Sequence, residues 1–353
     1  MLTRFIITEA SRLPVVVIRG GSSPVRLLLT LLLLFFTSCQ QRSCSQHEAS
    51  SVWENVEPLV AMEEGPSYHL LEGYDERWLE QVREGVEKAR AFWGSYGPAH
   101  VWVLGCEEGD SIREEAKQAF LAEYCEWRTA SSERTVSECL PYAEERFFDV
   151  VERGDPEAYL SDVRDTEQRM GELIFINVHK WYYEEDPLPD PVLRGMHEYT
   201  HIFQSAFGMM PTWMMEGGAV FSEVWLPWQE GLIEPHGKLE WIMQSARKGE
   251  SAGYTIADME EIESAPRRVA KYHRELAYDA GAWAMLFMIH ASPTQSVSAL
   301  RDEFYPLVTE LGWEAALSKY VGMQSKGAFY EAFELFMDAP REEQFALFDE
   351  LKP

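Results

Sequence analysis

The sequence predicts an α+β fold in which helix predominates. Two short apolar runs, Val101–Leu104 and Leu173–Val178, are typical of buried strands, and the second is rich in β-branched and aromatic residues. From Pro191 to the C-terminus, by contrast, the chain shows almost only helical patterns. Hydrophobic residues make up 46% of the chain and aromatic residues 13%, which indicates a globular protein with a sizeable core rather than a disordered one.

The N-terminus has the features of an export signal. Four arginines precede an apolar run, Leu27–Phe36, that only Thr30 interrupts. This run is too short to predict a membrane-spanning helix and fits the apolar part of a signal peptide. The residues before Cys39 resemble a bacterial lipobox, in which the cysteine is acylated and becomes the new N-terminus. We therefore predict a lipoprotein-type signal peptide over residues 1–38, with an uncleaved N-terminal anchor as the alternative.

The composition around and after Cys39 limits the partners we expect. Residues 39–60 are polar and predict a tether that lets the folded body stand off the membrane. The formal net charge of -28 would repel nucleic acid and anionic lipid headgroups. We therefore expect no nucleic-acid partner, and membrane contact only through the lipid of an exported, envelope-anchored protein. A solvated acidic surface is the simplest interpretation of the charge; a preference for cationic substrates is the alternative.

Residues 61–190 predict an N-terminal α/β subdomain with a helical insertion. Asp75 is placed to cap a helix whose apolar residues, from Trp78 to Trp93, recur at helical spacing, and Gly94 is placed to end it. The strand Val101–Leu104 follows. A charge-rich stretch from Asp110 to Arg169 then predicts helices, and it leads into the second strand.

The cysteines predict disulfides. Four remain after Cys39, namely Cys44, Cys106, Cys125 and Cys139, and an even number in an exported protein suggests that they pair. Four cysteines permit three complete pairings, which stay open. The last three are close enough in sequence for one local bridge among them to be expected. None has the C-x-x-C spacing of a metal site.

The helix that we expect from Pro191 carries a metal-binding motif. Proline is favoured at the first helical position because its missing N–H would have no intrahelical partner there. The helix contains His197-Glu198-Tyr199-Thr200-His201, an H-E-x-x-H motif. Histidines four apart lie on one helix face, so both imidazoles can reach one ion while Glu198 holds a water beside them. A helix with two surface histidines is the alternative.

The following segment supplies a carboxylate that could complete the site. Glu216 follows His201 after fourteen intervening residues, enough for the first helix to end at Gly208 and a second helix to return. A catalytic zinc takes three protein ligands and keeps one position open. Gly217-Gly218 would each cost about 1 kcal/mol in a helix relative to alanine, and close approach of the two metal-bearing helices would justify them.

Glu223 is predicted to support the ligands. It lies seven residues after Glu216 and so on the same helix face, where it could accept a hydrogen bond from a ligand histidine and fix its tautomer. A plain surface carboxylate is the alternative.

The H-E-x-x-H motif, followed by W-x-x-E-G-x-A and a further glutamate, resembles the gluzincin clan of metallopeptidases. Within that clan it is similar to the aminopeptidase N-like and the bacterial peptidase MA-like families, and the short gap between motifs favours the latter. The resemblance covers Pro191 to about Ser292. It implies Zn²⁺ bound by His197, His201 and Glu216, with Glu198 as the general base.

The same resemblance implies an architecture. Zincins of this kind place a small twisted sheet over the active-site helix and a helical subdomain below it. Val101–Leu104 and Leu173–Val178 would belong to the sheet. Residues 191–353 would supply both metal-bearing helices and the helical C-terminal subdomain.

A further match begins at Tyr278, where Y-D-A-G and an apolar helix resemble the Y-E-K-G segment of the aminopeptidase N-like enzymes. It implies that Tyr278 hydrogen-bonds the oxyanion of the tetrahedral intermediate; a buried structural tyrosine is the alternative. The G-x-M-E-N segment that binds a substrate's free amine has no counterpart here, so aminopeptidase specificity does not carry over. The remaining histidines are predicted to be non-catalytic: His47, His69, His100, His179, His236, His273 and His290.

Together these features predict a zinc metallopeptidase, in particular an endopeptidase acting on peptides or proteins at the cell envelope. The rival from another class is a catalytically inactive envelope lipoprotein that uses zinc for structure or for holding a partner. Structural zinc sites usually close the fourth position with cysteine or histidine, which the motif region lacks. A metal-free interaction protein would require every motif to be accidental. The sequence predicts neither the substrate nor the oligomeric state.

Overall fold

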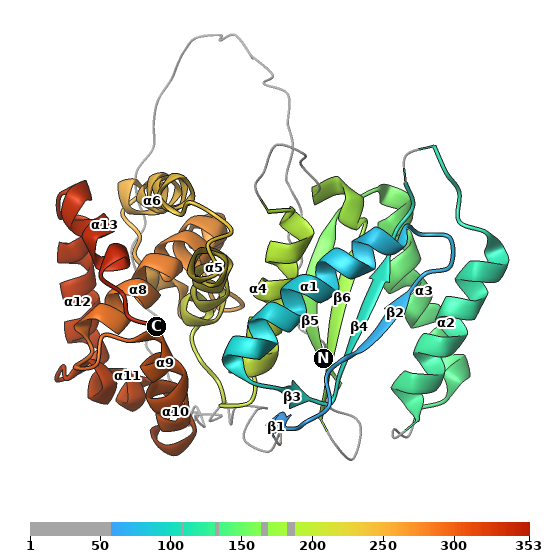
Figure 1. The fold of residues 1–353 in the computed structure, drawn as a ribbon, viewed down its shortest axis with the longest axis horizontal. Coiled ribbons are helices and arrows are strands. Elements are labelled where there is room, and N and C mark those ends of the chain that lie inside the picture. The colour runs from blue at the N-terminus through green and yellow to red at the C-terminus, as the bar shows by residue number, and fades with distance from the viewer. Residues whose placement is uncertain (1–57, 108, 131–133, 164–168, 182–187) are drawn as a thin grey trace, which may run out of the picture. The chain divides into compact units, whose positions relative to one another are not determined.

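A computed structural model describes residues 58–107, 109–130, 134–163, 169–181 and 188–353, which Figure 1 shows in colour. A small mixed sheet in the N-terminal part is followed by a helical C-terminal region, which confirms the predicted α+β class with helix predominating. The predicted signal peptide, Cys39, Cys44 and most of the tether lie outside the described residues. None of the helices in the described ranges is long and apolar enough to cross a bilayer.

The sheet is built around the two strands that the sequence predicts. The order in space is β2-β4-β6-β5, with β2, β4 and β6 parallel and β5 antiparallel to β6. β4 and β6 lie side by side at the centre, with Val101 opposite Leu173. Both runs are almost entirely apolar because helices cover both faces of the sheet. In chain order the strands are β1 (Val60–Ala61), β2 (Ser67–Leu70), β3 (Tyr96–Gly97), β4 (Ala99–Leu104), β5 (Glu157–Val163) and β6 (Met170–Ile176).

Helices α1 (Glu76–Trp93) and α4 (Asp190–Gln204) lie against one face of the sheet (Figure 1). Asp75 caps α1 and Gly94 ends it, as predicted. The two helices touch through glycines: a Cβ on Gly85 would lie 1.9 Å from the carbonyl oxygen of Val192, and one on Gly195 would lie 2.4 Å from that of Val82. Side chains are therefore excluded at this crossing, and α1 fixes the position of α4 through direct backbone contact.

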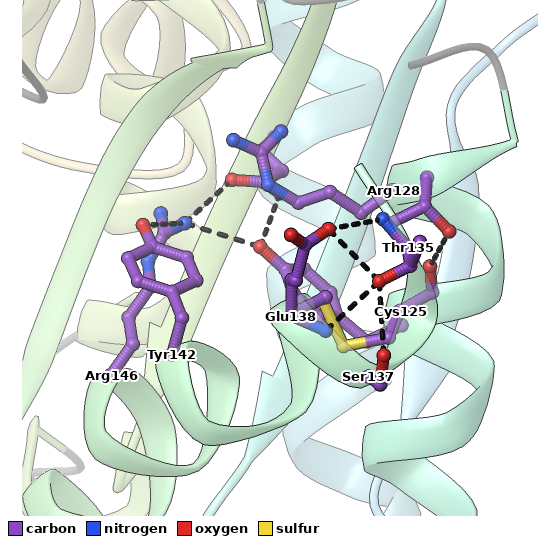
Figure 2. The surroundings of a disulfide bond; sticks show 11 residues. Cys125, Arg128, Thr135, Ser137, Glu138, Tyr142 and Arg146 are labelled. Atoms are coloured by element: carbon purple, nitrogen blue, oxygen red, sulfur yellow. Dashed lines mark hydrogen bonds and ion pairs between the residues drawn. A yellow bond between two sulfur atoms is a disulfide. The ribbon is translucent and has the colours of Figure 1, made fainter. Parts of the chain in front are cut away.

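Helices α2 (Glu114–Thr129) and α3 (Val136–Arg153) cover the opposite face. A disulfide between Cys125 and Cys139 joins them, which confirms the expected local bridge and selects its partners; Figure 2 shows it beside the Thr135 cap of α3. Cys106 is a free cysteine. The bridge lies on the far side of the sheet from α4.

The prediction of helix from Asp110 to Arg169 is wrong in its last part. Residues Glu157–Val163 form β5, the edge strand that pairs with β6. Gly154 ends α3 in the left-handed conformation, with φ of 71°, and Pro156 cannot continue a helix. The short segment that follows is then free to pair with the β6 backbone, a long-range contact that local patterns do not reveal.

From Asp190 onward the elements are helices, as predicted. Figure 1 shows α5 and α8 side by side in this region. The described helices after β6 are η1 (Val178–Trp181), α4, α5 (Thr212–Gln229), α6 (His236–Ser251), η2 (Ile256–Met259), α7 (Arg267–Ala270), η3 (Arg274–Ala280), α8 (Gly281–Ala291), α9 (Val297–Ala299), η4 (Leu300–Phe304), α10 (Tyr305–Leu311), α11 (Trp313–Val321), α12 (Lys326–Met337) and α13 (Arg341–Asp349).

The glycine pair in α5 serves two different contacts. A Cβ on Gly218 would lie 2.6 Å from Nε2 of Gln204 on α4, so this glycine does allow close approach of the two motif-bearing helices. A Cβ on Gly217 would instead lie 2.2 Å from the carbonyl carbon of Gly281, at the start of α8. The prediction that both glycines serve the contact with α4 is therefore wrong for Gly217, which holds α5 against a third helix.

Candidate metal centre

Three side chains from α4 and α5 converge in the interior. His197 and His201 lie one turn apart on α4, with ring centroids 4.9 Å apart. The nearer carboxylate oxygen of Glu216, on α5, is 3.3 Å from Nε2 of His197 and 3.5 Å from Nε2 of His201. All three residues are buried, at 2%, 7% and 5% exposure. Their ligand atoms lie within 4.8 Å of one another, so the group could hold a metal ion.

The turn between α4 and α5 brings these residues together. α4 ends at Gln204, one turn earlier than the predicted end at Gly208. The side chain of Gln204 donates hydrogen bonds to the carbonyl oxygens of Met214 and Met215 in the first turn of α5, and its own oxygen lies 2.9 Å from Nδ1 of His201. Gln204 therefore orients His201 and ties it to the helix that carries Glu216. Sequence reasoning missed this residue, although its position three residues after His201 was a usable signal.

Glu223 plays the corresponding part for His197. One carboxylate oxygen lies 2.8 Å from Nδ1 of His197, and the other accepts a hydrogen bond of 3.0 Å from Lys238. With a proton on Nδ1, the Nε2 lone pair of His197 faces Glu216. Burial opposes ionisation of Glu223, but Lys238, His197 and Arg194 outweigh it and hold the pKa of this carboxyl well below its usual range.

Glu198 lies beside the two histidines on α4 and is 4% exposed. Burial raises the pKa of its carboxyl above the usual value, although the neighbouring imidazoles act in the opposite direction. A buried carboxylate next to a potential metal site is placed to accept and release a proton.

Tyr278 lies in the π-helical turn η3 and closes one side of the group. Its ring stacks on that of His197, with centroids 5.8 Å apart and planes 14° from parallel. Burial and the charges of Glu216 and Glu198 raise the pKa of its hydroxyl well above the ordinary value. The hydroxyl therefore stays protonated at physiological pH and can donate a hydrogen bond.

His273 is also brought to this site, although the sequence predicts no catalytic part for it. Its ring meets the Tyr278 ring edge-on, with centroids 5.3 Å apart. Its Nε2 atom is buried without a hydrogen-bond partner among the described residues. No local motif surrounds His273, so only the fold places it here.

The charges around the group favour a divalent cation. Burial lowers the pKa of His197, but its contacts with Glu216 and Glu223 outweigh burial and raise it to about 10. Glu216 raises the pKa of His201 as well, against the effect of burial. The carboxylates that favour a proton on these two imidazoles would also favour a divalent ion between them. Two imidazole nitrogens and a carboxylate oxygen also form a donor set that Zn²⁺ takes in catalytic sites.

No family model, curated protein or solved structure matches this chain.

The structure brings together all the residues that the sequence singles out in the motif region: the three potential ligands, Glu198 beside them, and Glu223 and Tyr278 against His197. It adds Gln204, Lys238, Arg194 and His273, which the motifs do not include. Such an arrangement can hold one metal ion, keep its ligands in fixed orientations and place a proton acceptor next to it.

Proposed function

We propose that this protein is a zinc-dependent hydrolase of peptide bonds, most simply an endopeptidase. The observation that carries the proposal is the convergence of His197, His201 and Glu216 on one point, with Glu198 on the same helix face. The donor set fits zinc, and the carboxylate of Glu198, which is not a ligand, is buried beside the ligands with a pKa above its usual value. The resemblance of the two motifs to gluzincins supports the same reaction.

In the proposed mechanism a bound Zn²⁺ supplies Lewis-acid polarisation of the scissile carbonyl and a lowered pKa for the attacking water. Glu198 takes the proton of that water as it attacks, and later passes the proton to the leaving amine. Tyr278 donates a hydrogen bond to the developing oxyanion. Glu223 and Gln204 hold the two imidazoles in the orientation that ligation requires.

We also propose that the protein is exported and anchored to the cell envelope through a lipid on Cys39. The basic N-terminus, the apolar run and the lipobox-like residues support this location. The disulfide between Cys125 and Cys139 agrees with an oxidising compartment, because such bonds rarely persist in the cytosol. Labelling of expressing cells with a fatty-acid analogue tests the anchor: Cys39→Ala must abolish the label, and an equal label in both proteins would refute it.

The function is tested with zinc analysis and a peptide library. We expect one zinc per chain, cleavage that a chelator abolishes and added zinc restores, and at least about a 100-fold loss of rate in Glu198→Gln with zinc retained. Cleavage by Glu198→Gln at the wild-type rate would show that Glu198 is not the base.

The burial of all three ligand residues favours one second candidate, a zinc protein without catalysis. This candidate predicts the same zinc content and no cleavage of any peptide. Loss of zinc would then unfold the chain rather than inactivate an enzyme.

A further inference from the structure

We propose that Arg194 binds a carboxylate group of the peptide, so that the site selects peptides that carry a carboxylate near the cleaved bond. The inference rests on the proposed function in one respect: the bound peptide is taken to be a substrate. The carboxylate could belong to the C-terminus of the peptide or to an acidic side chain; the chemistry of recognition is the same.

The position of Arg194 on α4 places it beside the reacting groups. It precedes His197 by three residues and Glu198 by four, so all three share one face of the helix. Its Nη1 atom lies 3.9 Å from the Glu223 oxygen that contacts His197. A group bound to this guanidinium would therefore lie about one helical turn from the general base.

The guanidinium of Arg194 is poorly satisfied within the described protein. Its contacts with Asp190 and Glu223 measure 3.5 and 3.9 Å, longer than the 2.7–2.9 Å typical of a charge-assisted hydrogen bond. The Nε atom, which makes the Asp190 contact, is buried and has no hydrogen-bond partner of normal geometry among the described residues. Glu223, for its part, is already paired with Lys238 at 3.0 Å. Among the described residues, the terminal nitrogens of Arg194 thus have N–H groups left for a ligand.

Arg146, a buried arginine with several hydrogen-bond partners inside the protein, serves as a comparison for Arg194. Arg146 donates to Glu172 at 3.0 Å, and also to the hydroxyls of Tyr124, Tyr142 and Tyr159. Its side chain is only 4% exposed. Arg194 makes no such set of bonds, and its side chain is 26% exposed, so solvent and ligands can reach it.

The planar guanidinium group of Arg194, with its parallel N–H donors (the guanidinium fork), favours a carboxylate as the ligand. A guanidinium presents parallel N–H groups that match the two oxygens of a carboxylate, whereas a neutral amide offers one acceptor. The ring of Trp181 lies on one side of the guanidinium, with its centroid 5.8 Å from Cζ of Arg194.

The test compares three peptides of one sequence, chosen from the library for cleavage or binding. One is neutral with an amidated end, one carries Glu in place of Gln beside the cleaved or central bond, and one has a free C-terminus. Affinities are measured by calorimetry on zinc-loaded Glu198→Gln protein, with and without Arg194→Gln; cleavage rates are measured with the Glu198 enzyme.

We expect at least one carboxylate peptide to bind about 10-fold more tightly than the neutral peptide. Arg194→Gln should remove this preference while zinc content and neutral-peptide affinity stay within about threefold. Arg194→Lys should restore only part of it, because it keeps the charge without the fork. Arg113→Gln, which removes one exposed charge that pairs with Glu72, should keep the preference and is the matched control.

Two outcomes overturn the inference: no carboxylate preference in the parent protein, or a preference that survives Arg194→Gln, which would assign the carboxylate to the metal. If Arg194→Gln loses zinc, Arg194→Lys decides: a carboxylate preference as large as that of the parent overturns the inference. A carboxylate preference in binding without any cleavage would support Arg194 as a recognition residue and refute the proposed hydrolase. Failure of the inference can therefore be distinguished from failure of the proposed function.

Discussion

Glu223 on α5 and His197 on α4 are joined by a hydrogen bond of 2.8 Å between the carboxylate and Nδ1, and Lys238 holds the other oxygen of Glu223 at 3.0 Å. The contact connects the two motif-bearing helices at the side away from Glu216. It fixes which nitrogen of His197 is available to a metal ion.

Removing this support should weaken metal binding without removing a ligand. We expect Glu223→Ala to lower zinc affinity by about 10- to 100-fold, because the imidazole loses its orientation and its Nδ1–H is left buried without an acceptor. Glu223→Gln should lower it less, since an amide oxygen can still accept from Nδ1. Competition with a chelating dye measures both. Equal zinc affinity in Glu223→Ala and the parent would contradict this role.

The close approach of Gly217 to Gly281 makes a second prediction. An alanine Cβ at position 217 would lie 2.2–2.6 Å from backbone atoms of Gly281, so α5 and α8 would have to separate. We expect Gly217→Ala to lower the free energy of unfolding by about 1–3 kcal/mol or more. Gly237→Ala is the matched control: it lies in α6 with open space around it, and should be neutral or stabilise by up to about 1 kcal/mol. Urea unfolding should separate the two; similar effects would argue against the packing explanation.

The elements that could be predicted are those that local patterns determine. Helix α1 has its own cap and ending residue, and His197 and His201 share a helix face wherever that helix lies. The strand β5 could not be predicted, because its backbone hydrogen bonds belong to a partner strand. The same holds for Gly217, whose need for a small residue arises from Gly281, more than sixty residues later in the chain.

The same distinction applies to the residues of the site. The metal ligands lie in sequence motifs whose spacing is set by the geometry of metal binding, whereas some of the residues that orient the ligands lie in distant segments. Lys238 and His273 reach the site from α6 and from the residue before η3, and no pattern in their own segments refers to zinc. Contacts between distant segments are needed to find such residues.

The disulfide makes a third prediction. Cys125 and Cys139 are 14 residues apart, and closing a loop of this length restricts the unfolded chain. We expect the double change Cys125→Ala, Cys139→Ala to lower the free energy of unfolding by about 2–4 kcal/mol. Zinc content should not change, because the bridge and α4 lie on opposite faces of the sheet. Reduction of the parent should reproduce the loss in denaturant; an unchanged transition midpoint in the double variant would contradict the prediction.

The histidine pair on the sheet makes the last prediction, a loss of stability in mild acid. His100 Nδ1 lies 2.9 Å from Nε2 of His69, whose other nitrogen contacts Glu123 at 2.6 Å. Burial, chiefly, and the charge of His69 lower the pKa of His100 from 6.5 to about 4, while Glu172 acts in the opposite direction.

The unfolded chain therefore binds more protons than the folded one at His100 between about pH 6.5 and 4. Stability is fully present above this window and is lost as the pH falls through it. We expect the free energy of unfolding, measured in urea at fixed ionic strength, to decline across the window in the parent and to decline less in His100→Gln. The amide keeps a polar group beside His69 but does not titrate, so the difference between the two proteins isolates this group from other acid-sensitive sites. If the two curves stay parallel from pH 7 to 4, His100 titrates alike in the folded and unfolded chains, and its burial next to His69 has no effect on acid stability.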